Sequence, residues 1–122
     1  MRHLFYPLIL LFGFLLSSCT STNEVLLNEY EEIIGSTPNT SKNGVYTWNI
    51  NSDKAVLKET PLKEKTDKEL GMLPTIEKKL QVSPSTGDYF SSYVWESPEF
   101  RVVLYMDYQK NKQSIQLVFK EK

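Results

Sequence analysis

The sequence predicts an α+β fold in which one antiparallel sheet of about five strands carries helices on one face. Three observations support this fold class: an amphipathic helical pattern near the start, several short segments of alternating apolar and polar residues, and a Tyr-x-Trp segment that occurs twice. Alternation with a period of two is typical of half-buried strands, whereas helices have a period of 3.6 residues. A chain of 122 residues can form one small core.

The first predicted helix covers residues 24–34. Ser21-x-x-Glu24 is a capping box, in which each residue bonds a free backbone N–H of the first helical turn. Gly35 can take the left-handed conformation that ends a helix, and Pro38 prevents the helix from resuming. The apolar positions share one face: Val25, Leu26, Tyr30, Ile33 and Ile34.

A second helix is expected to start at Pro74, because proline suits a first helical position, and to stop before Pro84. Ile76 and Leu80 are one helical turn apart in this segment. Eight of the twelve residues at 58–69 are charged, so we expect a solvated loop or a frayed helix there.

Five strands are expected, at residues 45–50, 55–57, 93–95, 100–108 and 115–119. In the longest of them, every second side chain is apolar and is expected to face the core: Phe100, Val102, Leu104, Met106 and Tyr108. The alternate positions are expected on the opposite face: Arg101, Val103, Tyr105 and Asp107.

Two stretches resemble each other and predict tandem helix-strand-strand repeats at about residues 24–57 and 75–119. Each has a Ser/Thr-Pro turn, at Pro38 and Pro84, followed by a Tyr-x-Trp segment that ends at Trp48 or Trp95. A short aliphatic segment follows in both, at residues 55–57 and 102–104. Chance similarity between short turn-and-strand segments is the alternative explanation.

The N-terminus has the layout of a secretory signal. Arg2 and His3 give a basic start, and residues 4–16 form thirteen mostly apolar positions. That run is too short to be a permanent membrane-spanning helix. Its last residue starts the sequence Leu16-Ser17-Ser18-Cys19, which contains the only cysteine of the chain.

These four residues resemble the lipobox of bacterial lipoprotein signals. The resemblance implies cleavage between Ser18 and Cys19 and a thioether from Cys19 to diacylglycerol, so that the membrane is one partner. The expected domains are a signal peptide at 1–18, a tether at 19–23 and a single α+β domain at 24–122. Thr20, where enteric inner-membrane lipoproteins have Asp, points to the outer membrane in a Gram-negative host. An ordinary signal with an incidental or buried cysteine is the alternative.

The residue inventory argues against most catalytic and nucleic-acid-binding functions. The single histidine, His3, leaves with the signal, and lipidation would consume the single thiol, so triads and Cys/His zinc sites are unavailable. The formal net charge of −1 offers no basic field for nucleic acid. We therefore expect no cofactor, no metal and no catalytic residue. A carboxylate-dependent glycan hydrolase is the least favoured function, with these acids as candidates: Asp88, Glu96, Glu99 and Asp107.

The order of helix, Gly-x-x-Pro turn and Tyr-x-Trp strand resembles small outer-membrane assembly lipoproteins of the BamE type. The duplication resembles the β-lactamase-inhibitory-protein architecture. The residues that carry the likeness are Gly35, Pro38, Tyr46 and Trp48, with Pro84, Tyr93 and Trp95 in the second copy. The second copy has no glycine equivalent to Gly35 at position 80 or 81. These families bind other proteins through the sheet, so the resemblance implies a non-enzymatic function.

The expected function is therefore that of a lipid-anchored protein of the cell envelope that binds another protein. The candidate interaction surface is Arg101, Tyr105 and Asp107, because tyrosine and arginine are frequent interface anchors. The alternative is an inhibitor or immunity protein for an envelope hydrolase, with an acidic loop at residues 89–99 that would enter the cleft of the enzyme.

Overall fold

The computed structural model describes residues 21–51, 53–110 and 112–122. Along these residues, two α-helices, one short 3₁₀ turn and six strands follow one another. The elements are α2 (Thr22–Ile34), β1 (Thr40–Lys42), β2 (Val45–Ile50), η1 (Asp53–Ala55), α3 (Val56–Leu70), β3 (Ile76–Val82), β4 (Tyr89–Glu96), β5 (Phe100–Gln109) and β6 (Lys112–Glu121).

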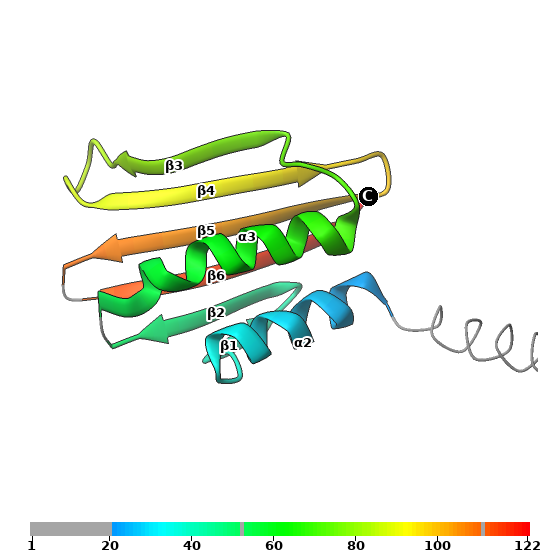
Figure 1. Ribbon diagram of the computed structural model, residues 1–122, viewed down its shortest axis with the longest axis horizontal. Helices are drawn as coiled ribbons and strands as arrows, with labels where there is room; N and C mark the ends of the chain where they lie inside the picture. The colour runs from blue at the N-terminus through cyan, green and yellow to red at the C-terminus, as the bar shows by residue number, and fades with distance from the viewer. Residues whose placement is uncertain (1–20, 52, 111) are drawn as a thin grey trace, which may run out of the picture.

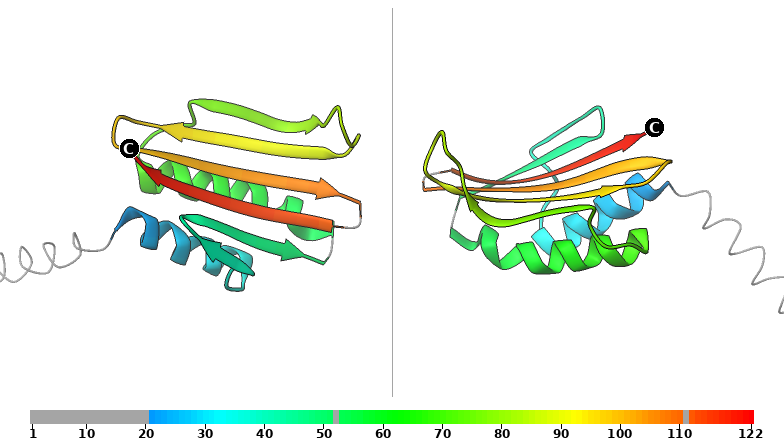
Figure 2. Two further views of the ribbon diagram at one scale, coloured as in Figure 1. Left: turned by 180° about the vertical axis from the view of Figure 1, so that it is seen from behind. Right: turned by 90° about the horizontal axis from the view of Figure 1, so that it is seen from above.

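All six strands form one antiparallel sheet in the order β1-β2-β6-β5-β4-β3. Both helices pack on the same face of this sheet, the face seen in Figure 1, and the view from behind in Figure 2 shows that no other element of the described chain covers the opposite face. The predicted α+β class, with one antiparallel sheet, is confirmed. The sheet has six strands in place of the expected five or so.

Helix α2 begins and ends where the sequence predicts. The Ser21 hydroxyl oxygen accepts a hydrogen bond from the Glu24 backbone N–H at 3.2 Å. Gly35 has a φ of 91°, and its N–H donates to the Glu31 carbonyl at 2.8 Å. Leu26 and Tyr30 are completely buried against the sheet, so the amphipathic pattern marks the packed face correctly.

The segment expected to be a strand at 55–57 and a solvated loop or frayed helix at 58–69 is instead a packed helix, α3. Its buried positions are Glu59, Leu62 and Thr66, which lie on one helical face. Only one of the three is apolar, and Pro61 lies inside the helix. The sequence pattern therefore lacks the apolar stripe that identifies a buried helix.

The two polar positions on this face are satisfied by tyrosines. The hydroxyls of Tyr93 and Tyr108 both donate to the Glu59 carboxyl group. The bond from Tyr93 is 2.6 Å long. Tyr30 and Thr66 share a hydrogen bond of 2.6 Å. These partners come from β4, β5 and α2, so the position of α3 depends on contacts between distant parts of the chain.

The predicted second helix after Pro74 is wrong, because that segment is the edge strand β3. Its register with β4 shifts between Lys78 and Gln81, which marks a β-bulge, and Leu80 has a φ of 48° within it. A spacing of four residues fits one turn of a helix and also the alternation of a strand, so Ile76 and Leu80 do not distinguish the two.

Strand β1 is absent from the sequence prediction, although the chain contains a signal for it. Asn43 and Gly44 have φ values of 54° and 77° and connect β1 to β2. Two positive φ values in a two-residue turn favour Asn-Gly, a strong short-range hairpin signal.

Each helix is followed by the same local pattern, a left-handed glycine with a proline three residues later. This pattern corrects the expected repeat boundaries. Gly71 ends α3 in the left-handed conformation, as Gly35 ends α2, and Pro74 follows it as Pro38 follows Gly35. A hairpin with a buried tryptophan comes next in both cases. The second unit therefore starts with α3 and not near residue 75.

Each tryptophan is bound to the helix of its own unit. Trp48 and Trp95 are completely buried. The Trp48 Nε1–H donates to the Ser36 carbonyl at 2.9 Å, just after α2, and the Trp95 Nε1–H donates to Asp67 Oδ1 of α3 at 2.9 Å. These bonds fix the position of both helices on one face and leave the other face of the sheet uncovered.

Candidate interaction surface

The open face is the side of the sheet that points away from both helices. On it, five aliphatic side chains lie in direct register across five strands, and we call them the aliphatic row: Ile76, Val94, Val103, Val118 and Val45. The four valines are half-buried by their neighbours, and Ile76 on the edge strand is exposed. The row thus gives the open face a continuous apolar band.

An aromatic pair lies beside the aliphatic row. The rings of Phe90 and Tyr105 stack with centroids 5.8 Å apart and an interplanar angle of 20°. Burial of the Tyr105 ring, together with the nearby charge of Asp107, raises the pKa of its hydroxyl. Tyr105 therefore stays neutral on this face and offers both apolar area and a hydrogen-bonding group.

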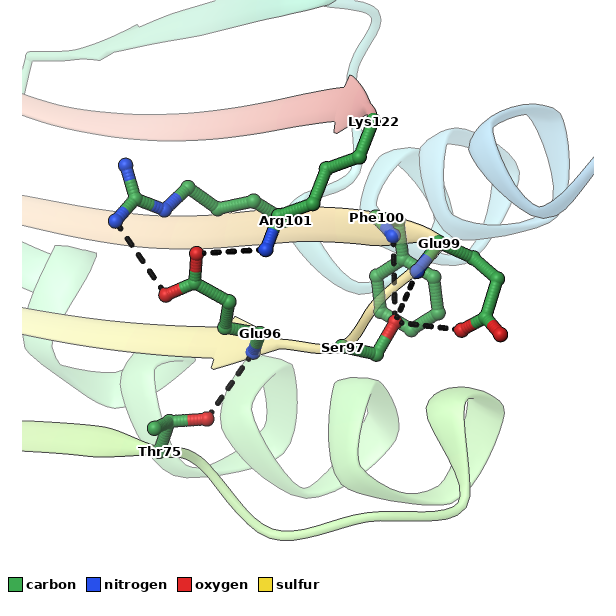
Figure 3. A network of polar contacts seen from close by, with 7 residues as sticks. All are labelled: Thr75, Glu96, Ser97, Glu99, Phe100, Arg101 and Lys122. Atoms are coloured by element: carbon green, nitrogen blue, oxygen red, sulfur yellow. Dashed lines mark hydrogen bonds and ion pairs between the residues drawn. The ribbon is translucent and has the colours of Figure 1, made fainter.

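Arg101 belongs to a charged network at one end of the open face (Figure 3). Its Nη2 lies 3.4 Å from Glu96 Oε2, and the Lys122 Nζ lies 2.8 Å from Glu96 Oε1. These cations, Lys122 first, lower the pKa of the Glu96 carboxyl. The Thr75 hydroxyl accepts from the Glu96 backbone N–H at 3.1 Å, so the network connects the residue before β3 with β4, β5 and Lys122.

Asp107 lies at the other end of the open face, beside a shallow polar hollow of about 260 Å³. The Gln109 side chain donates to Asp107 Oδ2 at 3.0 Å. The hollow is lined by Thr47, Asn49, Asp107, Gln109, Lys112 and Ser114. The open face therefore has a charged end, an apolar middle and a polar end.

The three predicted interface residues share this face, as the alternation on β5 indicates, but they do not form one cluster. Glu96 pairs with Arg101 and Phe90 pairs with Asp107 in the β4–β5 register. Arg101 and Asp107 are therefore six residues apart along β5, or about 20 Å at 3.3 Å per residue. The sequence reasoning missed the aliphatic row that lies between them, because alignment across five strands depends on register.

Three of the four candidate carboxylates make local contacts: Glu96, Glu99 and Asp107. The fourth, Asp88, directly precedes β4. Glu96 binds Arg101 and Lys122, while Glu99 accepts from the Ser97 hydroxyl at 3.1 Å. Glu96 on β4 lies opposite Arg101, so Glu96 and Asp107 are also about 20 Å apart along the strands. Glycoside hydrolysis needs two carboxyl groups within about 10 Å. This pair is too widely spaced to act on one glycosidic bond.

The acidic loop expected at residues 89–99 is mostly strand β4 in the structure. Ser91, Tyr93 and Trp95 of this strand are buried beneath the helices. Residues 89–96 therefore cannot enter the cleft of an enzyme as a flexible loop.

The predicted lipid-attachment residues, Ser18 and Cys19, lie outside the described residues. Within the described ranges, neither helix has the length and apolar character that a membrane crossing requires. Residues 21–51, 53–110 and 112–122 also contain no group of three acidic, histidine or cysteine side chains that could hold a metal ion.

Comparison of the chain with protein-family models, with curated proteins and with solved structures gives no match in any of the three.

Proposed function

We propose that this chain is a lipid-anchored protein of the cell envelope that binds another protein through the open face of its sheet. The observation that carries the proposal is the aliphatic row beside the Phe90–Tyr105 pair, on the face that no described element covers. An apolar centre with a polar rim is the usual anatomy of a protein interface.

The ends of the open face supply the specificity in this proposal. The Arg101–Glu96–Lys122 network and the hollow at Asp107 place charged and polar groups on either side of the apolar middle. Charged groups at a rim select partners and orientations more than they add affinity. A partner is thus expected to present an apolar strip with polar groups at both ends.

Lipid attachment at Cys19 is the second part of the proposal and is supported by the lipobox-like sequence. Helix α2 starts at Thr22, directly after its cap Ser21. Two residue steps separate Cys19 from Ser21, so the link spans at most about 7 Å. An acylated Cys19 would keep the domain at the bilayer surface, in the outer membrane if the host is Gram-negative.

A photocrosslinking residue placed at Val103 tests the binding surface in intact cells. We expect one discrete crosslinked product from Val103, and loss of that product when Tyr105→Ala is added. The matched control position is Leu57, which is 67% exposed on α3, on the helix-covered side. Equal crosslinking from Leu57 and Val103, or none from Val103, contradicts the proposal.

Mass spectrometry of the native protein tests the anchor separately. A diacylglyceryl mass on an N-terminal Cys19 is expected, and Cys19→Ala should abolish labelling by a fatty-acid analogue. An unacylated protein that starts at Met1 contradicts the anchor and leaves the test of the open face unaffected.

A further inference from the structure

The loop between α3 and β3, residues 71–75, presents a leucine to the surroundings. Leu73 is 72% exposed, the highest value among the large apolar side chains of the described residues. Its neighbours Leu70 and Met72 pack partly against the core. An isolated exposed apolar side chain is common in proteins. Leu73 is informative because the fold holds it rigidly and places it at one particular end of the molecule.

Backbone hydrogen bonds hold Leu73 in its exposed position. On one side of it, the Met72 N–H donates to a carbonyl oxygen near the end of α3 at 3.2 Å. On the other side, the Thr75 N–H donates to a carbonyl oxygen of β4 at 2.6 Å. Pro74 also favours an extended backbone at the residue before it. Because the helix and the sheet hold both ends of this short loop, the Leu73 side chain stays outside the core.

Leu73 lies at the end of the molecule where α2 begins, and the end of α3 and the C-terminus lie there too (Figure 1). The Tyr46 hydroxyl of β2 donates to the Asn23 side chain at 3.1 Å, which fixes the first turn of α2 to the sheet. The proposed attachment residue, Cys19, is at most about 7 Å from Ser21. We propose that loop 71–75 rests on the lipid bilayer and that Leu73 inserts among the lipid headgroups. This inference rests on the anchor at Cys19, which is part of the proposed function.

The anchor makes one inserted leucine sufficient. Burial of a single leucine side chain is too weak to hold a free protein on a membrane. In a tethered protein the bilayer is always close at hand, so Leu73 needs only to select one orientation. Charge attraction is not the cause, because exposed acidic and basic residues alternate at this end, as Lys68-Glu69 and Lys120-Glu121. The contact is therefore expected to be apolar and independent of anionic lipid.

This orientation determines how a partner reaches the open face. Strands β4, β5 and β6 run from the end that carries Leu73 to the opposite end of the molecule (Figure 1). With Leu73 in the headgroups, these strands point away from the membrane. Strand β5 contains ten residues, so the open face extends to about 33 Å from the bilayer surface. A protein that binds this face then approaches from the side, parallel to the membrane.

A matched pair of fluorescent labels tests this orientation in the acylated protein, placed in lipid nanodiscs. Leu73→Cys and Leu57→Cys each provide one free thiol for the fluorophore NBD, because the thioether blocks Cys19. Leu57 is 67% exposed and lies at the other end of α3, a 15-residue helix about 22 Å long. Nitroxide-labelled lipid quenches on contact, and a headgroup layer is only about 5–8 Å thick. We expect it to quench the label at position 73 and not the label at position 57.

A second pair of variants tests whether Leu73 itself causes the orientation. The label is placed on Lys68→Cys, at an exposed position in the last turn of α3. Leu73→Asp should remove most of the quenching of this label, whereas Leu57→Asp should leave it unchanged. Added salt should change the quenching in neither variant, because salt screens only charge attraction. Equal quenching in the two variants would contradict the role of Leu73.

Intact-mass measurement of each sample separates this inference from the proposed anchor. Acylated protein in which the label at position 73 is not quenched, or in which positions 73 and 57 are quenched equally, overturns the inference and leaves the anchor standing. Protein without the acyl group overturns the anchor and this inference with it. A shift of the NBD emission to shorter wavelength at position 73 without quenching by lipid means that another protein molecule covers Leu73, which also overturns the inference.

Discussion

The two faces of the sheet are made by the same strands, yet they differ in what covers them. On the helix side, Trp48, Trp95 and Leu104 are completely buried. On the open face, Val103, Val118 and their neighbours are only half-buried, because their contacts come from the sheet itself. One face supplies most of the stability of the domain and the other is left uncovered by the described chain, so changes on the two faces should have separable effects.

The largest effect is expected from truncation on the helix side. Leu104→Ala should lower the free energy of unfolding by about 2–5 kcal/mol, because it leaves a cavity beneath the helices. Its neighbour Val103 points to the open face, and Val103→Ala should cost less than about 1 kcal/mol. Urea unfolding of the two variants measures the difference. Similar losses for both would mean that the open face is also covered.

The next largest effect concerns the buried carboxyl group on α3. Glu59→Ala removes the acceptor for Tyr93 and Tyr108 and should cost about 2–4 kcal/mol, because one buried and one partly buried hydroxyl lose their partner. Glu64→Ala changes an exposed position on the same helix and should cost less than about 0.5 kcal/mol. Thermal unfolding of both variants makes this comparison. No loss of stability in Glu59→Ala would show that the two tyrosines find other hydrogen-bond acceptors.

The third largest effect is expected at alkaline pH, where the buried tyrosines on the helix side should lower the free energy of unfolding. Burial raises the pKa of Tyr30 and, together with the bond to Glu59, that of Tyr93. Because the unfolded tyrosines ionise near pH 10, the unfolded state loses protons first above that pH. Stability is therefore fully present below about pH 10 and falls as pH rises, by up to about 1.4 kcal/mol per pH unit for each tyrosine.

Urea unfolding at pH 9 to 11.5 measures this slope. Tyr30→Phe should be less stable at neutral pH, since Thr66 loses its bond to Tyr30 and keeps only the one to the Leu62 carbonyl, but its stability should fall less steeply above pH 10. An identical slope in Tyr30→Phe would contradict the assignment of the pH dependence to this residue.

The smallest effect is expected in the charged network of the open face. Lys122→Ala should raise the pKa of Glu96, because Lys122 is the main group that lowers it. The free energy of unfolding should stay within error, since exposed ion pairs contribute little and are screened by salt. NMR titration of the Glu96 carboxyl carbon detects the change in pKa. A marked loss of stability would show that the network holds the C-terminus in place.

Several elements were predictable because their signals are local. The cap at Ser21, the left-handed Gly35 and the apolar stripe define α2. The period of two assigned each residue of β5 to its correct face, and it placed Arg101, Tyr105 and Asp107 together on the open one. Asn43-Gly44 shows that β1 could also have been predicted.

Helix α3 and strand β3 could not be identified from local pattern. The packed face of α3 contains Glu59 and Thr66, and the burial of the Glu59 carboxyl group is tolerable because tyrosines from β4 and β5 donate hydrogen bonds to it. The Thr66 hydroxyl donates to the Leu62 carbonyl of the same helix and also bonds to Tyr30 of α2. A bulge shifts the alternation of β3. In both cases the deciding interactions join residues far apart in the chain.

The sequence by itself thus determined the α+β class, the α2 helix, the two-faced pattern of the strands and the face of β5 that contains Arg101, Tyr105 and Asp107. These depend on backbone preferences and on periodicity within a few residues. Only the tertiary structure decided which face the helices cover and the register that aligns the aliphatic row. Those features arise from pairing and packing between distant segments, and neither is encoded in any single stretch of the chain.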